Sequence, residues 1–341
     1  MNAIAETRWV EGLLGAKSWL PGWLLQAGLR LYLEADYQLE VSSGTLSTIA
    51  APETAALAEM SRELMSVHYD MPLPLFTHML GPTMKYSMAL WSNGATTLEE
   101  AQRDMLEDVC RKAGVRDGDT VLDLGCGFGS LAAHVLRTFP HARVTGLTLS
   151  RTQADYLRQC QAQPGHALNT PRFELVEGDF NEVDFPERFD RVLSLGVFEH
   201  VSNLTGALAK VRRFLRPAGA LFLHYIVYLQ ARPGEMPPRQ NAFIQRHVFP
   251  GARVYAFTEL ERHQENCALL SSWYLPGTNY ERTLERWLGN FLRHRAAIAR
   301  EAGLDERTLR VWELYLRTCA ANFAAGGGWA FGNGQYLLSG R

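Results

Sequence analysis

The sequence predicts an α/β protein with a doubly wound, mostly parallel sheet of seven strands, a helical N-terminal region and an inserted cap. Short, nearly continuous apolar segments alternate with amphipathic helical segments between residues 117 and 228. This is the pattern of repeated βαβ units whose sheet is buried on both faces. The first apolar segment ends in a glycine-rich turn. Doubly wound sheets bind ligands at such strand ends, so this turn is the first candidate for a binding site.

The N-terminal region, residues 1–115, is expected to be helical. Residues 57–72 carry apolar side chains at helical spacing. Residues 96–115 predict a clear amphipathic helix, with two threonines as cap candidates and two acids in the first turn. Residues 19–34 predict a short amphipathic helix that packs on the protein, with a helix lying on a membrane surface as the alternative.

Residues 116–341 form the second predicted unit, which holds all seven strands. An irregular insertion rich in proline and glycine, at about 229–265, separates the fifth strand from the last two. Two helices, at about 281–302 and 305–323, precede the final strand. The predicted strands lie at residues 119–125, 142–149, 172–178, 189–196, 219–227, 268–277 and 335–339.

Composition narrows the function classes. Apolar residues make up 47% of the chain and charged residues 21%, which excludes extensive disorder. The net charge of −2 argues against a nucleic-acid partner, because polyanion binding needs a basic surface. The five cysteines are scattered without a Cys-x-x-Cys pair, so we expect no metal site, no disulfides and a cytoplasmic location. No apolar run is long enough to span a bilayer.

The glycine-rich turn favours one cofactor over another. Gly125, Gly127 and Gly129 form a Gly-x-Gly-x-Gly pattern that Asp123 precedes by two residues. Glycines at a strand-to-helix turn let a ligand approach the backbone closely. Asp123 would repel a phosphate but attract an ammonium group, and the second strand lacks the acid that usually binds a dinucleotide ribose. These features favour S-adenosylmethionine over NAD. A tight turn that binds nothing is the third alternative.

Several segments carry a resemblance to a known family. They are VLDLGCGFGS, GLTLSRTQ, EGDF, VLSLGVFEHV and the upstream HYDMPLPLFTHMLGPTMKYSMALWSNGATTLEEAQ. Together they resemble class I S-adenosylmethionine-dependent methyltransferases of the cyclopropane-fatty-acid-synthase type. The branch of plant coclaurine-type N-methyltransferases is also similar, including at NYERTLERWL and YLRTCAANFAAGGGW. The resemblance runs from about His68 to the C-terminus and implies a Rossmann-like methyltransferase fold.

The resemblance implies a cofactor site, residue by residue. The acid and glycines of the turn correspond to the family's glycine loop, and the T-x-S-x-x-Q after the second strand corresponds to its ribose and adenine contacts. A Tyr-Ser pair corresponds to the segment over the methionine carboxylate, and an Asp-Phe pair to further adenine contacts. The implied cofactor-binding residues are Tyr86, Ser87, Asp123, Gly125, Gly127, Gly129, Thr148, Ser150, Gln153, Asp179 and Phe180.

The implied chemistry centres on four residues. Glu199 and His200 follow the fourth strand and match the Glu-His pair of both branches. In the amine branch this pair holds or deprotonates the substrate, whereas in the lipid branch the glutamate helps to hold a bicarbonate base. His224 and Tyr280 match bicarbonate-site residues of the lipid branch. For each of the four, a structural hydrogen bond or core packing is the alternative role.

Two departures from the family pattern leave the site of neither branch complete. Met88 stands where the lipid branch has a cysteine, so we expect thioether bulk in the bicarbonate pocket. Gly196 stands where the amine branch has a second glutamate.

The sequence therefore predicts a methyltransferase of a small-molecule acceptor, with an amine nitrogen as the leading candidate. The alternatives are C-methylation or cyclopropanation of an unsaturated fatty acyl lipid, and S-adenosylmethionine binding without catalysis. A homodimer is compatible with the sequence. The identity of the acceptor and the number of methyl groups added stay open.

Overall fold

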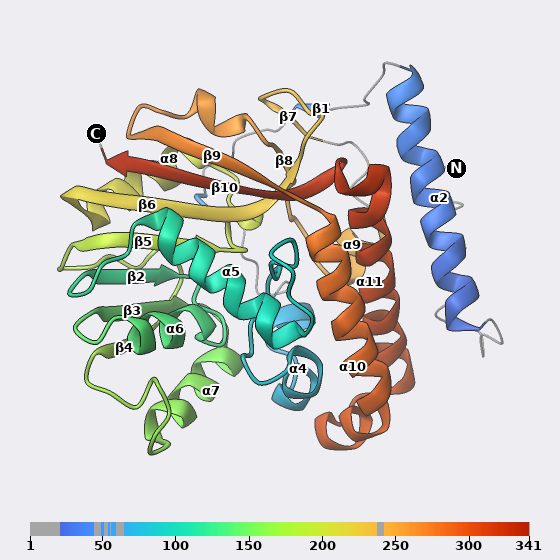
Figure 1. The fold of residues 1–341 in the computed structure, drawn as a ribbon, viewed down its shortest axis with the longest axis horizontal. Coiled ribbons are helices and arrows are strands. Elements are labelled where there is room, and N and C mark those ends of the chain that lie inside the picture. The colour runs from blue at the N-terminus through green and yellow to red at the C-terminus, as the bar shows by residue number, and fades with distance from the viewer. Residues whose placement is uncertain are drawn as a thin grey trace.

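The predicted doubly wound sheet is confirmed and forms the centre of the molecule (Figure 1). The computed structural model describes residues 21–43, 49–50, 54, 56–58, 65–236 and 242–340. Five neighbouring strands run parallel, and the last strand of the chain runs antiparallel between its two neighbours. In order across the sheet, the strands are β4 (Phe173–Glu177), β3 (Arg143–Thr148), β2 (Thr120–Leu124), β5 (Phe189–Leu195), β6 (Leu215–Tyr228), β10 (Phe331–Gly340) and β9 (Cys267–Pro276).

The strand order reverses at β2. The chain first proceeds from β2 to β3 and β4 on one side, and then returns to place β5 on the other side of β2. Such a reversal leaves a crevice at the carboxyl ends of the diverging strands, and doubly wound proteins bind their ligands there. A short strand that the sequence did not predict, β8 (Tyr255–Ala256), pairs with the end of β6.

Helices cover both faces of the sheet (Figure 1). Three of them, α5 (Leu98–Ala113), α6 (Ser130–Thr138) and α7 (Arg151–Ala162), share one buried hydrophobic cluster with β2 and β3. On the opposite face, α8 (Leu204–Phe214) belongs to a second cluster. The parallel strands are thus buried on both sides, which is why they read as continuous apolar segments.

Helix α5 begins where the sequence predicts. The Thr97 hydroxyl accepts a hydrogen bond from the Glu100 amide at 3.2 Å, and the Glu100 carboxylate accepts one from the Thr97 amide at 3.0 Å. This reciprocal capping box satisfies two amide groups that the first turn would otherwise leave without partners. The helix ends at Gly114, whose φ of +65° suits a left-handed cap.

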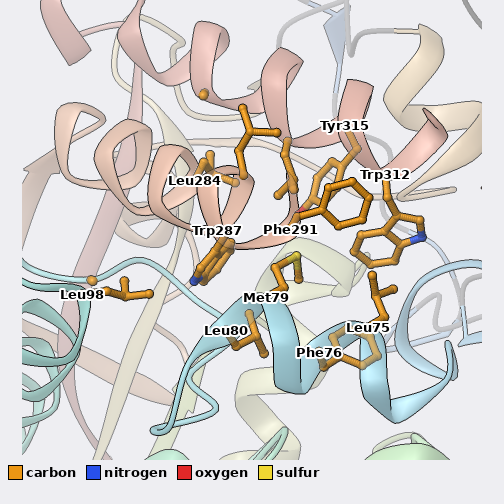
Figure 2. Packing of buried hydrophobic residues seen from close by; sticks show 14 of the residues in the cluster. Leu75, Phe76, Met79, Leu80, Leu98, Leu284, Trp287, Phe291, Trp312 and Tyr315 are labelled. Atoms are coloured by element: carbon orange, nitrogen blue, oxygen red, sulfur yellow. The ribbon is translucent and has the colours of Figure 1, made fainter. Parts of the chain in front are cut away.

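A helical layer stands beside the carboxyl end of the sheet (Figure 1). Helices α10 (Thr278–Ala302) and α11 (Glu306–Ala324) form its centre, with α4 (Leu73–Leu80) against α10 and α2 (Gly22–Ser43) along α11. Figure 2 shows the buried aromatic and aliphatic side chains that join α4 to α10 and α11, among them Phe76, Trp287, Phe291 and Trp312. This layer covers one side of the crevice at which the strand order reverses.

The N-terminal region departs from the predicted helices in two ways. Of the expected helix at 57–72, residues 59–64 lie outside the described residues, and Met65–Tyr69 form a single π-helical turn, η1. A strand that was not predicted, β1 (Ile49–Ala50), pairs with β7 (Glu235–Met236) in the insertion. Hydrophobic periodicity cannot distinguish such short segments from a helical turn.

Helix α2 continues to Ser43, past the predicted end at residue 34; residues 19 and 20 of the prediction lie outside the described residues. Its inner side packs on α11, and its Arg30 forms ion pairs with Glu281 and Glu285 on α10. Its outer side leaves Trp23 and Leu31 more than 70% exposed. Among the helices that the structure describes, none is both long and apolar enough to cross a membrane.

Candidate active site

Two adjoining cavities open at the carboxyl ends of β2, β3 and β5. The smaller, of about 100 Å³, lies against the glycine-rich turn and is called the loop cavity here. The larger, of about 220 Å³, lies between the sheet and the helical layer and is called the aromatic cavity. A group bound in one cavity can therefore meet a group bound in the other. The residues that line both cavities are Tyr69, Tyr86, Ser87, Gly196 and His200.

The glycines of the turn shape the loop cavity. Gly125, Gly127 and Gly129 have φ angles of +79°, +57° and +75°, which residues with a Cβ rarely adopt. A Cβ on Gly125 would also collide with the side chain of Val197. Gly125 and Gly127 line the cavity, so a ligand can lie against the backbone there. Gly129 lies outside the lining, at a place where a Cβ would collide with the side chain of Leu157.

Asp123 contributes a buried negative group without a cationic partner. The side chain is 2% exposed, and Oδ2 has no hydrogen-bond partner among the described residues. Burial raises the pKa of Asp123 to about 7. A ligand ammonium would supply the missing charge partner, as S-adenosylmethionine would through its amino-acid end. The chain's own residues thus fit the predicted cofactor at this end.

The polar residues of the T-x-S-x-x-Q segment line the loop cavity and are held by one another. Thr148 donates its hydroxyl proton to Gln153 Oε1 at 2.7 Å, which leaves the amide nitrogen of Gln153 as the donor for a ligand. Ser150 accepts from the Gln153 backbone amide at 3.2 Å and donates to Asp70 Oδ1 at 2.7 Å. Ser150 therefore caps α7 and ties the N-terminal segment to the cavity rim.

Of the Asp179-Phe180 pair, Phe180 lies at a cavity and Asp179 does not. Phe180 is 4% exposed and lines the loop cavity, where its ring can pack against a planar base. Asp179 lines neither cavity, because its Oδ1 accepts hydrogen bonds from the backbone and side-chain amides of Asn181 at 2.7 and 2.8 Å. The Oδ1 of Asp179 thus caps its own loop, and the structure does not bring this residue to either cavity.

Glu199 lies on the short turn η2 (Phe198–His200) that follows β5 and faces the aromatic cavity. Its Oε1 accepts a hydrogen bond from the Ile226 amide at 2.9 Å, whereas its Oε2 is buried without a partner among the described residues. Burial raises the pKa of Glu199 from the ordinary 4.5 to about 7. A carboxyl group with this pKa can exchange a proton at neutral pH.

His200 lines both cavities and therefore lies at their junction. Its Nε2 lies 3.0 Å from the hydroxyl of Tyr69, and its Nδ1 has no partner among the described residues. Burial lowers the pKa of His200 to about 4. The ring is therefore neutral at neutral pH and is a weaker base than Glu199 beside it.

Of the remaining predicted residues, three lie at the cavities. Tyr280 lines the aromatic cavity, and Tyr86 and Ser87 line both. The Tyr86 hydroxyl lies 2.7 Å from Nε2 of His68, which fixes its position at the junction.

His224 lines neither cavity and is 1% exposed on β6. Its Nε2 lies 3.0 Å from Nδ2 of Asn333, and its Nδ1 lies 3.3 Å from Nε2 of Gln335, both on β10. Asn333 does line the aromatic cavity, so the side chain of His224 contacts a residue of that cavity without lining it.

Met88 does not lie in the position that its place in the sequence predicted. Its side chain is fully buried in the hydrophobic cluster beneath α5 and α6, and it lines neither cavity. The expected thioether bulk in a bicarbonate pocket is therefore absent from the aromatic cavity, because the chain turns this side chain toward the core.

The sequence did not predict several of the residues that line the cavities. Tyr69 lies in the HYDMP segment that carries part of the resemblance, and this was a signal that could have identified it. Phe249 comes from the irregular insertion and Tyr315 from the middle of α11, so nothing in the sequence distinguished them from core aromatics. Asn333 is one polar residue in the last strand, and only the pairing of β10 with β6 brings it to the cavity.

Comparisons with known proteins identify similar chains. A family model described as mycolic acid cyclopropane synthetase matches residues 58–328. The (S)-coclaurine N-methyltransferase of Thalictrum flavum subsp. glaucum is 30% identical over 222 residues, which cover 64% of this chain and 60% of that protein. The cyclopropane-fatty-acyl-phospholipid synthase of Escherichia coli (strain K12) is 29% identical over 333 residues, which cover 92% of this chain and 81% of that protein.

A solved structure shares the whole architecture. A coclaurine N-methyltransferase bound to N-methylheliamine and S-adenosylhomocysteine superposes with a TM-score of 0.82 at 23% identity, covering 98% of this chain and 99% of that one. At this identity the likeness shows the fold. The match to the Thalictrum enzyme spans less than two thirds of that enzyme's length, and relatives of both branches are similar to this chain.

Proposed function

Because the chain belongs to the mycolic acid cyclopropane synthetase family of S-adenosylmethionine-dependent methyltransferases, we propose that it transfers the methyl group to the amine nitrogen of a small molecule. The observation that carries this proposal is a set of buried polar atoms without partners on residues that line the aromatic cavity. Among the described residues of this cavity, the atoms without a partner are Glu199 Oε2, His200 Nδ1, Asn333 Oδ1 and His68 Nδ1.

Buried polar atoms without partners are costly, so they favour a ligand that supplies the missing hydrogen bonds. Each such atom costs on the order of 1–3 kcal/mol. An amine or ammonium acceptor brings N–H donors that suit the two oxygens of Glu199 and Asn333. The double bond of a fatty acyl chain can satisfy none of the four atoms.

The walls of the aromatic cavity suit the same ligand. Tyr69, Phe249, Tyr280 and Tyr315 contribute rings from four separate segments of the chain. Aromatic faces attract ammonium groups, by about 0.5–2 kcal/mol each when water is excluded. The cavity can therefore hold both a protonated acceptor and the cationic product of repeated methylation.

The protein's part in the reaction is to orient the acceptor, exclude water and take a proton. Bound S-adenosylmethionine supplies a methyl group that is already activated by the sulfonium. An acceptor amine attacks only when its nitrogen is neutral, so it must give up a proton. Glu199 is the better acceptor of that proton because its pKa is raised to about 7, whereas that of His200 is lowered to about 4. His200 at the junction would hold the nitrogen in line with the methyl group.

The second candidate is methylation or cyclopropanation of an unsaturated fatty acyl lipid. The similarity to the Escherichia coli synthase over 92% of this chain favours it. Met88 gives no argument against it, because this residue lines neither cavity. The choice between the two candidates therefore rests on the polar atoms of the aromatic cavity.

Initial rates with matched acceptors test the proposal. A panel of aromatic secondary amines is compared with their carbon isosteres and with vesicles of cis-unsaturated phospholipid, before and after dissolved bicarbonate is removed. We expect turnover of amines alone, at a rate that does not depend on bicarbonate. Turnover of the vesicles, restored by added bicarbonate, would instead support the lipid candidate.

A further inference from the structure

Lys85 is a buried cation whose hydrogen-bond partners are neutral. The residue is 1% exposed, and its Nζ donates to Ser87 Oγ and to the Met88 carbonyl, both at 2.6 Å. Buried lysines are normally paired with a carboxylate, because an isolated charge is costly in the interior. Burial lowers the pKa of Lys85 to about 7, and no acid among the described residues offsets this effect.

Ser87 connects Lys85 to both cavities. Because Ser87 Oγ accepts a hydrogen bond from Lys85 Nζ, its own hydroxyl proton remains available to a ligand. Ser87 lines both cavities and lies against Gly196 at their junction. An acceptor atom placed there would therefore complete a chain from the ligand through Ser87 to the lysine.

The other charges around Lys85 do not neutralise it. His224 is buried, and its pKa is lowered by burial and, in addition, by the charges of Lys85 and Lys112. Lys112 is itself paired with Asp108 at 2.7 Å. Among the described residues, Lys85 thus has no carboxylate that balances its charge, and Asp123 at the loop cavity has no cation.

A ligand that bears both an ammonium and a carboxylate complements these two groups, and the amino-acid end of S-adenosylmethionine bears both. We propose that Lys85, through Ser87, positions the α-carboxylate of the cofactor and balances its charge. Lys85 is a positioning residue in this account, since Ser87 makes the contact. The inference concerns the cofactor alone and does not depend on which acceptor the enzyme methylates.

The test compares two ligands by calorimetry. S-adenosylhomocysteine carries the carboxylate, whereas its decarboxylated analogue keeps the ammonium and the nucleoside. Lys85→Met replaces the buried charge with an apolar chain of similar length, which the interior tolerates well. We expect this change to reduce the affinity for S-adenosylhomocysteine by about 10- to 100-fold, the usual range for a charge-assisted contact. The affinity for the analogue should change by less than about 3-fold.

Two further variants complete the test. Ser87→Ala should produce the same selective loss, and the double variant should be little worse than either single one, because both act on one contact. Lys112→Met, which removes a lysine paired elsewhere, should affect neither ligand. An equal loss of both ligands in Lys85→Met would make Lys85 a purely structural residue and overturn the proposal. Unchanged affinity for S-adenosylhomocysteine in either Lys85→Met or Ser87→Ala would overturn it as well.

Discussion

The hydroxyl of Tyr69 lies 3.0 Å from Nε2 of His200 and joins the N-terminal segment to the turn after β5. This contact fixes the imidazole at the point where the two cavities meet, and it turns Nδ1 away from Tyr69. Tyr69, which lies outside the sheet, thus orients His200 on the turn that follows β5.

Removing that hydroxyl should reduce turnover without reducing the affinity for the cofactor. In Tyr69→Phe the ring of His200 loses its fixed orientation, so we expect kcat to fall by about 10-fold, the value of one neutral hydrogen bond. Because both residues act through one contact, Tyr69→Phe should add little to the defect of His200→Ala. Steady-state kinetics of the two single variants and the double variant measure this coupling. Additive losses would contradict it.

Asp123 should govern cofactor affinity. Asp123→Asn keeps the shape of the side chain but removes the charge that a ligand ammonium would meet. Affinity for S-adenosylhomocysteine, measured by calorimetry, should fall by about 10- to 100-fold. Asp108→Asn is the matched control, because Asp108 is also buried but is paired with Lys112 away from both cavities. Equal effects of the two substitutions on affinity would show that Asp123 does not bind the ammonium group of the cofactor.

Glu199 should govern turnover and its dependence on pH. A base must be unprotonated to act, and the pKa of Glu199 is raised to about 7. The rate should therefore rise with pH through about 7. Glu199→Gln should lower kcat by about 100-fold and abolish that rise, with cofactor affinity changed by only a few-fold. Glu259→Gln, at a buried acid that lines neither cavity, serves as the control. An unaltered pH profile in Glu199→Gln would contradict the assignment.

The same residue should make the protein less stable as pH rises. Its pKa is higher in the folded protein than the ordinary 4.5, so folding binds a proton between pH 4.5 and about 7, and stability is lost across that window. Glu199→Gln removes the ionisable group. In thermal or urea unfolding, the variant should be more stable than the parent by on the order of 1–3 kcal/mol at about pH 8, with little difference near pH 4.5. A variant that is less stable at the higher pH would be at odds with a strained buried carboxylate.

Much of the fold could be predicted from the sequence because its signals are local. The apolar strands, the capping box at Thr97 and the glycine turn each follow from neighbouring residues. Asp123 and the Glu199-His200 pair could be predicted for the same reason, since Asp123 lies near the end of the buried strand β2 and the pair lies on the turn after the buried strand β5. The aromatic cavity could not be predicted, because Tyr315 and Asn333 reach it only through the packing of α11 and the pairing of β10.

Burial also changes what a matched residue can do. His224 matches a motif position, yet its ring nitrogens lie against Asn333 and Gln335 outside the cavities. Met88 likewise occupies a motif position while its side chain points into the core. A motif gives the place of a residue in the chain, whereas the partners of its side chain depend on tertiary packing.

The central claim is that the methyl group goes to nitrogen, and the position of the transferred carbon tests it most directly. The enzyme is supplied with S-adenosylmethionine carrying a ¹³C methyl group, together with an aromatic secondary amine and cis-unsaturated phospholipid vesicles in one reaction, and the products are examined by carbon NMR. The account predicts label in an N-methyl group, and its loss in Glu199→Gln. Label in a cyclopropane methylene or a branched methyl of the acyl chain, with none on nitrogen, would contradict it.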